Sequence, residues 1–319
     1  MSILITKPGI LTTIQDLGRP GAQRFGLNPG GVMDRATVRF LNILLGNDET
    51  AAVLEMHFPA CAIEFEVDAL IAVGGADFSP HVEGRPVPNG TTVFIPKGGL
   101  LTFTKRITGQ RAYLAVREGL HVQEWRGSRS TNFVASVGGL DGRKLAAGDR
   151  IECSASVDTK HLSLGTSLRP RHDGPVVIRV VAGNEHEFLT ALSERDLLNE
   201  IFTLTSDCDR MGYRLEGKRL HLLHPREMVS SAVTFGTVQL LPDGQQVVLM
   251  ADHQTAGGYP RIASVVSADL PLLAQCGPGD RLRFEMVSIK EAEQLSMKFE
   301  RILNFLRVGC RLQGQNANY

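Results

Sequence analysis

Glycine and proline divide this chain into many short apolar runs, and this punctuation restricts its fold more than any other sequence feature. The 319 residues include 33 glycines and 15 prolines. Residues 62–68 and 281–287 alternate between apolar and polar side chains, a pattern typical of half-buried strands. Short strands separated by turn residues are typical of mainly β proteins. The sequence therefore predicts a mainly β fold with few helices.

Further strands are expected at similar short runs, and one pair of runs predicts a hairpin. Residues 237–241 and 247–250 flank the sequence Pro242-Asp243-Gly244-Gln245. Its Asp–Gly step supplies the positive φ of a tight turn between antiparallel strands. The other expected strands are residues 1–8, 70–73, 92–95, 100–104, 112–116, 150–153, 176–181 and 202–205.

The longest predicted helix covers residues 289–308. Apolar side chains recur there at helical spacing and form one stripe. Ser288 and Glu291 form a capping box at its start, and Gly309 is expected to end it.

Two shorter helices are also predicted. Residues 35–45 lie between Asp34 and Gly46, which are suitable residues for the N-terminal and C-terminal caps of a helix. Residues 185–199 carry the third helical pattern.

The length of the chain predicts roughly two domains. Residues 154–175 are poor in apolar side chains and rich in Ser, Thr, Arg and Gly, so we expect the boundary there. A Gly-Asp turn precedes an alternating strand at residues 148–153 and again at 279–284, a short echo that favours two similar halves. The expected division is an N-terminal β subdomain at 1–155, a linker at 156–175 and a C-terminal β subdomain at 176–319.

The charge balance excludes some classes of partner. Lys and Arg together number 34, as do Asp and Glu, so the formal net charge is zero. Non-specific binding to nucleic acid or to an anionic membrane needs a basic excess. No apolar run approaches the roughly 18 residues of a membrane span, and the first residues lack the pattern of a signal peptide. We therefore expect a cytoplasmic protein that binds neither nucleic acid nor membranes.

The sequence contains no standard catalytic or metal-binding motif. Its five cysteines are far apart and include no CxxC, and its nine histidines are scattered, so neither a metal nor a disulfide is expected. His221 and His224 lie three apart in a strand-like stretch, which places them on opposite faces. The phosphate-binding loop GxxxxGK[ST] and the nucleophile elbow GxSxG are absent.

Chemistry is expected instead in polar, glycine-containing segments between strands. Arginine offers planar bidentate donors for carboxylate or phosphate, and glycine permits close backbone approach. Residues 250–261 gather a carboxylate, an imidazole, an amide and a hydroxyl group directly after a strand. The other segments are residues 15–20, 127–131, 138–143 and 209–215. Each has a structural alternative, either a tight turn or, for 209–214, an internal Asp–Arg ion pair.

These segments carry a family resemblance. TIQDLGR at 13–19, GSRST at 127–131, DRMGYRL at 209–215 and VLMAD at 248–252 with QTAGGYP at 254–260 occur in this order. The chain thereby resembles the biotin-dependent carboxyltransferase-like family from Ile3 to about Ala292. Members of that family include the C subunits of bacterial ATP-dependent 5-oxoprolinases (KipA-like), the second subunit of allophanate hydrolase and part of urea carboxylase.

The resemblance implies a fold, partners and a reaction. The fold would be two cyclophilin-like β-barrel subdomains. The partners would be a smaller B subunit (KipI-like) and an A subunit, in a hetero-oligomer that opens the lactam of 5-oxoproline to glutamate with ATP. ATP would bind this chain in an unrecognised mode or lie with a partner. Biotin is not expected on this chain, which has no biotinyl-lysine motif of the Ala-Met-Lys-Met type.

Two other functions remain open within the resemblance. One is that of the carboxyltransferase component of a urea carboxylase or allophanate-type system. The other is that of a regulatory module that sequesters an inhibitor of a sensor kinase. The chain departs from the family pattern at Arg117-Glu118, Asn132, Asn184 and Gln246, which leaves the exact substrate open.

The predicted site combines the motif residues. Asp252 is expected to be a general base, with Arg129 and Arg210 holding the substrate carboxylate and developing negative charge. We expect Asp252, Gln254, Tyr259 and Arg210 to line one cleft at a barrel rim; the alternative is a buried Asp252–Arg210 ion pair. The expected substrate-binding residues are Gln254, Thr255, Gly257, Gly258, Tyr259, Ser128 and Ser130.

Overall fold

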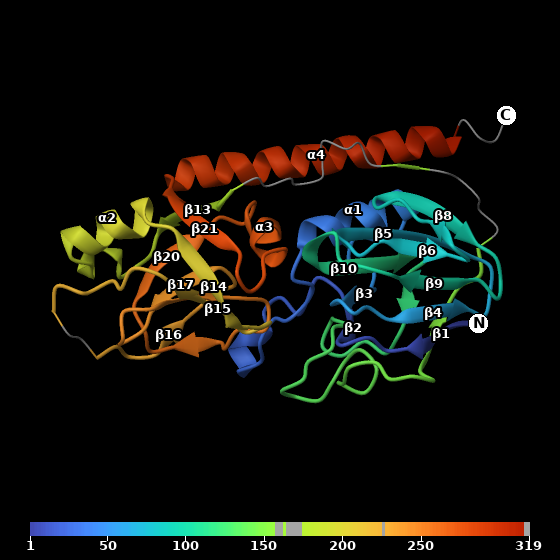
Figure 1. Cartoon of the computed structure of the whole chain (residues 1–319), viewed down its shortest axis with the longest axis horizontal. Helices are drawn as coiled ribbons and strands as arrows, with labels where there is room; N and C mark the ends of the chain where they lie inside the picture. Colours follow the sequence, from blue (N-terminus) through green and yellow to red (C-terminus); the bar gives the residue numbers. More distant parts are fainter. Residues whose placement is uncertain (157–161, 164–173, 225–226, 316–319) are drawn as a thin grey trace. The chain divides into compact units, whose positions relative to one another are not determined.

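The computed structural model describes residues 1–156, 162–163, 174–224 and 227–315. They form a mainly β protein with few helices (Figure 1), which confirms the fold class expected from the sequence. The chain divides into two compact units, and the expected linker at 156–175 lies mostly outside the described residues. Unit 1 contains Met1–Arg19, Gly30–Arg169 and Glu300–Tyr319, and unit 2 contains Pro20–Pro29 and Pro170–Phe299.

Unit 1 contains two antiparallel sheets. The seven-stranded sheet has the order β11 (Leu120–His121), β12 (Arg150–Cys153), β1 (Ser2–Lys7), β4 (Ala62–Phe65), β9 (Leu100–Phe103), β6 (Pro80–Val82) and β7 (Arg85–Pro86). The five-stranded sheet has the order β2 (Thr12–Gln15), β3 (Val53–Met56), β10 (Thr108–Val116), β5 (Ala69–Asp77) and β8 (Thr91–Ile95).

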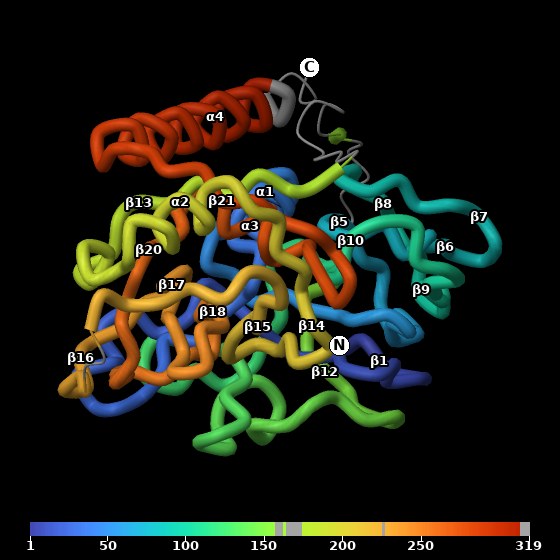
Figure 2. The backbone as a smooth tube through the Cα atoms, turned by 60° about the vertical axis from the view of Figure 1, so that its left-hand side comes forward, coloured from blue at the N-terminus to red at the C-terminus, as the bar shows by residue number. Residues whose placement is uncertain are grey.

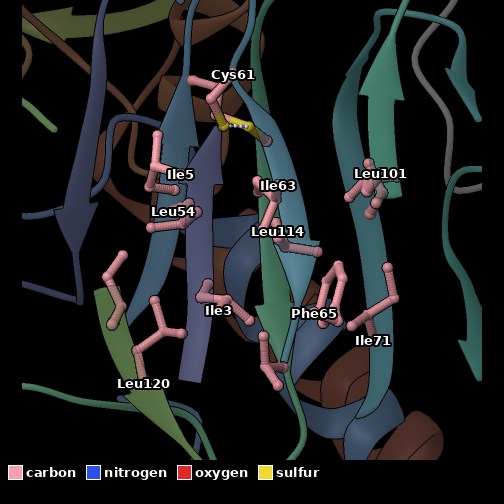
Figure 3. Packing of buried hydrophobic residues seen from close by; sticks show 14 of the residues in the cluster. Ile3, Ile5, Leu54, Cys61, Ile63, Phe65, Ile71, Leu101, Leu114 and Leu120 are labelled. Atoms are coloured by element: carbon pink, nitrogen blue, oxygen red, sulfur yellow. Dashed lines mark hydrogen bonds between the residues drawn. The ribbon is translucent and has the colours of Figure 1, made fainter. Parts of the chain in front are cut away.

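The core of unit 1 lies between these sheets (Figure 3). Ile3 and Phe65 from the seven-stranded sheet belong to the same buried cluster as Leu54, Ile71 and Leu114 from the five-stranded sheet, and all five are inaccessible to solvent. Burying such side chains contributes about 1.5–3 kcal/mol each. The alternation seen in the sequence thus reflects strands with one face on this core.

Helix α1 (Arg35–Leu45) packs on the other face of the five-stranded sheet, where Leu41 joins a buried cluster that includes Tyr113. Both predicted caps are confirmed. The Asp34 carboxylate accepts a hydrogen bond from the Thr37 amide at 2.9 Å, and Gly46 adopts a left-handed conformation at φ 71°.

Unit 2 is a closed seven-stranded barrel. Its strands have the order β13 (Val176–Ala182), β20 (Arg261–Val265), β17 (Thr237–Leu240), β18 (Gln246–Leu249), β15 (Gly212–Glu216), β14 (Phe202–Cys208) and β21 (Arg281–Met286). Only β13 and β21 pair in parallel among these strands, which closes the barrel. Figure 2 shows β15 between β14 and β18.

The predicted hairpin between β17 and β18 is confirmed. The two strands pair antiparallel, and the Leu241 amide donates to the Gln245 carbonyl at 2.8 Å across the turn. Gly244 has a φ of 83°, which is the positive value that the Asp–Gly step predicted.

The third predicted helix is wrong in its first half. A short 3₁₀ turn, η3 (His186–Phe188), and α2 (Ala191–Asn199) replace the continuous helix expected at 185–199. Leu189 and Thr190 between them are extended, and the Thr190 hydroxyl accepts a hydrogen bond from the Ser193 amide at 3.1 Å. This N-cap starts a new helix where the apolar pattern suggested continuation.

The last helix is longer than predicted. α4 spans Ile289–Gln315, with the capping box of Ser288 and Glu291 in place. Gly309 lies inside the helix instead of ending it, because an interior glycine costs only about 1 kcal/mol relative to alanine. Among the described residues, no helix is long and apolar enough to cross a membrane.

Each unit takes a segment from a distant part of the chain, unlike the contiguous division expected from the sequence. Residues 20–29, which include η1 (Ala22–Phe25), belong to unit 2, where the Asn28 side-chain amide donates to the Asp252 carbonyl at 3.0 Å. Residues 300–315 belong to unit 1, where Glu300 accepts two hydrogen bonds from Arg39 of α1. Unit 2 also contains α3 (Leu270–Ala274) and the short strands β16 (Ser231–Ala232) and β19 (Ala256–Gly257).

Candidate functional site

A cleft of about 610 Å³ lies in unit 2 on the outside of the barrel wall. Its floor includes Arg214, Val247 and Gln239, which form one row across three strands because Val247 pairs with both of the others. Their neighbours Tyr213 and Val248 point to the other face and are buried inside the barrel. The floor of the cleft is therefore a patch of barrel wall, which the prediction of a site at the barrel rim did not include.

Two loops border this floor. One is the end of β14 and the turn that follows it, which contributes Asp207, Asp209 and Met211. The other follows β18 and contributes Gln254 and Tyr259. The structure thus brings together Gln254 and Tyr259, two of the predicted substrate-binding residues. Both belong to the polar segment at residues 250–261.

An amide pair covers part of the floor. Gln239 is 2% exposed, and its carbonyl oxygen Oε1 accepts a hydrogen bond from Gln254 Nε2 at 3.4 Å. No acceptor among the described residues lies within hydrogen-bonding distance of Gln239 Nε2. A Cβ at Gly257 would lie 2.5 Å from this nitrogen. Any side chain at position 257 would therefore collide with the Gln239 amide, which explains the glycine there.

The other two predicted loop residues have backbone roles. The Thr255 carbonyl accepts a hydrogen bond from the Val233 amide at 3.3 Å, and Gly258 is half-buried near Met228 and Ser230. Neither is among the residues that line the cleft.

Arg210 and Asp252 lie together behind the cleft and do not line it. Arg210 Nε donates to Asp252 Oδ2 at 2.7 Å and Arg210 Nη2 to Oδ1 at 3.0 Å, and the side chains are only 6% and 11% exposed. The Asp252 amide also donates to the Arg210 carbonyl at 2.7 Å. This buried bidentate pair joins the two loops that border the cleft. It matches the structural alternative considered for these residues.

The predicted residues of unit 1 gather around a carboxylate that sequence reasoning missed. Asp16 Oδ1 accepts hydrogen bonds from the hydroxyls of Ser128 and Ser130, both at 2.6 Å, and from the Gly18 amide at 2.8 Å. Asp16 Oδ2 accepts from the Arg129 amide at 2.5 Å. Both serines are completely buried. Asp16 therefore fixes the 128–130 loop, and its only sequence signal was its place in the first motif.

The Arg129 side chain points away from this cluster. It is 37% exposed and lies 3.5 Å from a carboxylate oxygen of Glu124. Residues 138–143, which the sequence allowed as either a tight turn or part of a site, pack on the 128–130 loop. Gly138 has a φ of 71°, and a Cβ there would lie 2.1 Å from the Ser130 carbonyl oxygen. This contact explains why glycine is needed there.

Arg214 and Gln239 were also missed as site residues. Gln239 occupies one position of an otherwise ordinary strand, so no local signal distinguished it. In the described part of the chain, no group of three or more His, Cys, Asp or Glu side chains is placed to hold a metal ion.

Comparison with known proteins supplies a family context. The family model described as carboxyltransferase domain, subdomain A and B, matches residues 25–286. The C subunit of 5-oxoprolinase from Haemophilus influenzae is 38% identical over 92% of this chain and 94% of that protein. Its counterpart from Escherichia coli is 35% identical over 98% of this chain and 99% of its own length. The crystal structure of Kluyveromyces lactis urea carboxylase superposes with a TM-score of 0.89 at 26% identity, covering 96% of this chain but 29% of that enzyme.

Proposed function

Because the chain belongs to the carboxyltransferase domain family of subdomains A and B, we propose that it acts as the C subunit of an ATP-dependent 5-oxoprolinase. The observation that carries this proposal is the end-to-end match to two bacterial proteins that are named as 5-oxoprolinase C subunits. Identity of 35–38% over more than nine-tenths of this chain and of each relative indicates that they share one architecture.

The proposed reaction adds water across a ring amide. The C–N bond of the lactam breaks, the nitrogen takes up a proton, and glutamate is released. An amide carbonyl is a poor electrophile, so ATP is used to activate it, and ADP and phosphate are released together with glutamate. We assign lactam binding to the unit 2 cleft, an open cleft whose volume lies in the range of small-ligand sites and whose lining is both polar and apolar.

The cleft lining does not suit the phosphate chain of ATP. Asp207 and Asp209 stand at its border, and Arg214 is the only arginine or lysine among the described residues that line it. A polyanion would meet like charge there. We therefore assign ATP binding to partner subunits.

The roles of the remaining motif residues follow from their contacts. Both oxygens of Asp252 are engaged by Arg210, which favours a positioning role for the pair at the cleft border. Asp16 and its serines order the 128–130 loop, and this leaves the exposed Arg129 guanidinium as a candidate contact for a partner or for an anionic group.

A second candidate function is a carboxyltransferase half-reaction on a urea-like acceptor. The likeness to urea carboxylase of Kluyveromyces lactis favours it. This chain corresponds to less than a third of that enzyme, so the biotin carrier would be a separate protein.

Reconstitution tests the proposal. The chain is purified with the products of neighbouring genes for the A and B subunits, and glutamate formation from 5-oxoproline is followed with and without ATP. We expect ATP-dependent turnover by the full assembly and little or none by this chain alone. Robust turnover by the single chain would contradict the divided site. An assembly that carboxylates urea but leaves 5-oxoproline intact would favour the second candidate.

A further inference from the structure

We propose that the unit 2 cleft recognises its ligand through two separate elements: the Gln239–Gln254 amide pair, which binds a cis-amide, and Arg214, which binds a carboxylate. The ligand class is then a small cyclic amide that carries an acid group. The inference deepens the proposed function and rests on it for the identity of the ligand as 5-oxoproline.

The first element follows from the hydrogen-bonding capacity of two side-chain amides. Each amide offers two N–H donors and a C=O acceptor, and one hydrogen bond joins Gln254 Nε2 to Gln239 Oε1. Gln239 Nε2 then remains as a donor, and Gln254 keeps its Oε1 acceptor and one N–H. A lactam presents C=O and N–H on the same edge of its ring, which complements one acceptor and one donor side by side.

Burial makes the donor selective. Gln239 is 2% exposed, and its Nε2 lacks an acceptor among the described residues. Leaving a buried donor unsatisfied is unfavourable, so a ligand carbonyl that reaches it recovers that free energy. A side chain at position 257 would collide with this nitrogen, so the glycine keeps other side-chain atoms from that approach.

The second element is a cation without a carboxylate in contact. Within the described chain, Arg214 forms no ion pair within 4 Å, and its Nη1 donates to the neutral Gln245 Oε1 at 3.3 Å. The nearby Asp243 attracts Arg214 at longer range, but its ion pair is with Arg219 at 3.0 Å. A guanidinium in a cleft is suited to bind a carboxylate with two hydrogen bonds.

The spacing of the two elements suits a small ring. Arg214 and Gln239 are separated by one strand in the same row, which places their Cα atoms about 10 Å apart. Among the described residues, only a 3.3 Å hydrogen bond to Gln245 holds the guanidinium toward the hairpin turn, so we expect it to turn from that contact toward Gln254 when the ring is bound. Asp207 and Asp209 at the cleft border repel anions. A carboxylate is therefore favoured only where it contacts Arg214.

The test crosses three ligands with three variants. Binding of 5-oxo-L-proline, 2-pyrrolidone and L-proline to the purified chain is measured by calorimetry or ligand-observed NMR. Pyrrolidone has the lactam without the carboxylate, and proline has the carboxylate without the lactam carbonyl. The variants are Arg214→Gln, Gln239→Leu and the control Arg283→Gln, which removes the same charge from an exposed position of β21 outside the cleft lining.

We expect each variant to affect only the ligands that carry its group. Arg214→Gln should weaken 5-oxoproline binding by roughly 10-fold or more and leave pyrrolidone unchanged. Gln239→Leu should weaken both lactams to a similar extent and spare proline. Arg283→Gln should leave the binding of all three ligands unchanged. Equal losses for all ligands, or unchanged 5-oxoproline affinity in both cleft variants, would overturn the inference. If Gln239→Leu does not fold, Gln254→Leu removes the acceptor from the half-buried side of the pair.

The same variants in the reconstituted assembly separate this inference from the proposed function. A raised KM for 5-oxoproline in Arg214→Gln supports both. Full activity with an unchanged KM in both cleft variants would refute the inference and keep the function. Selective lactam binding without glutamate formation by the wild-type assembly would refute the function and keep the inference. The inference would also be overturned if neither the chain alone nor the assembly bound any of the three ligands.

Discussion

At the scale of single residues, the Arg210–Asp252 pair illustrates how chemistry inferred from a motif depends on burial. Asp252 follows a strand in a polar segment, which predicted a base in a cleft. The structure buries it on a guanidinium that occupies both carboxylate oxygens. The sequence analysis included an Asp252–Arg210 ion pair as an alternative. The extent to which the two side chains are buried could not be read from the sequence.

Replacing Asp252 by asparagine should therefore act on stability first. The change leaves the Arg210 charge buried with a neutral partner, which typically costs about 3–5 kcal/mol. Chemical denaturation measures this loss. Asp243→Asn is a matched control, because Asp243 pairs with Arg219 at a site where the side chains are 55% and 47% exposed, and such pairs contribute only about 0–1 kcal/mol. A melting temperature that barely moves while the assembly loses roughly 100-fold in activity would instead restore Asp252 as a base.

The substitution Asp16→Asn tests the cluster in unit 1. An asparagine side chain would present one carbonyl oxygen and an NH₂ group to four donors that now share a carboxylate. We expect a loss of about 2–3 kcal/mol and faster amide hydrogen exchange at Arg129. Ser128→Ala removes one donor only and should cost about 1 kcal/mol. Equal effects of the two variants would contradict the shared-carboxylate arrangement.

At the scale of elements, the sequence predicted best where local chemistry decides. The Gly-Asp echo is confirmed as a matching pair of turns: Asp149 accepts from the Ala146 amide at 2.7 Å, and Asp280 accepts from the Gly277 amide at 2.8 Å. Gly148 and Gly279 have φ values of 90° and 88°. The caps of α1 are equally local. By contrast, the row of Arg214 and Gln239 depends on strand register, which no short segment encodes.

The attachment of α4 in unit 1 depends on charged side chains. Glu49 accepts a hydrogen bond from Arg39 Nε at 2.7 Å and also pairs with Arg307 of α4. These side chains are about one-fifth exposed or more, so Glu49→Gln should cost only about 1 kcal/mol. It should nonetheless increase amide exchange across residues 300–312. Glu293→Gln, at an exposed position of the same helix, should leave that exchange unchanged. Identical exchange in both variants would show that apolar packing alone holds the helix.

At the scale of the whole molecule, several carboxylates are stabilised in their charged form. Hydrogen bonds from Arg261 hold the pKa of Glu185 below its ordinary value, and those from Arg143 and Arg39 do the same for the pKa values of Asp149 and Glu300. A group whose pKa is lowered by folding adds stability above its unfolded pKa, near pH 4. That stability is lost as the pH falls through the folded value.

We therefore expect the melting temperature to be steady near neutral pH and to fall steeply below about pH 4. Glu185→Gln should lower stability at pH 7 by about 1–3 kcal/mol, since Glu185 is buried and bound twice by the Arg261 side chain. The variant should also flatten the acid limb of the profile. A wild-type protein that is more stable at pH 3 than at pH 7 would contradict this account.

The reciprocal exchange of segments has a consequence for how the chain acquires its structure during synthesis. Unit 2 includes residues 20–29, which are synthesised well before the rest of their barrel. Unit 1 includes residues 300–315, which are synthesised after that barrel. Domains usually fold as independent units in order of their synthesis, but here the first unit cannot be complete before the second has been translated. A gene divided at the junction between the units would therefore yield two fragments, each lacking a piece that the other fragment carries.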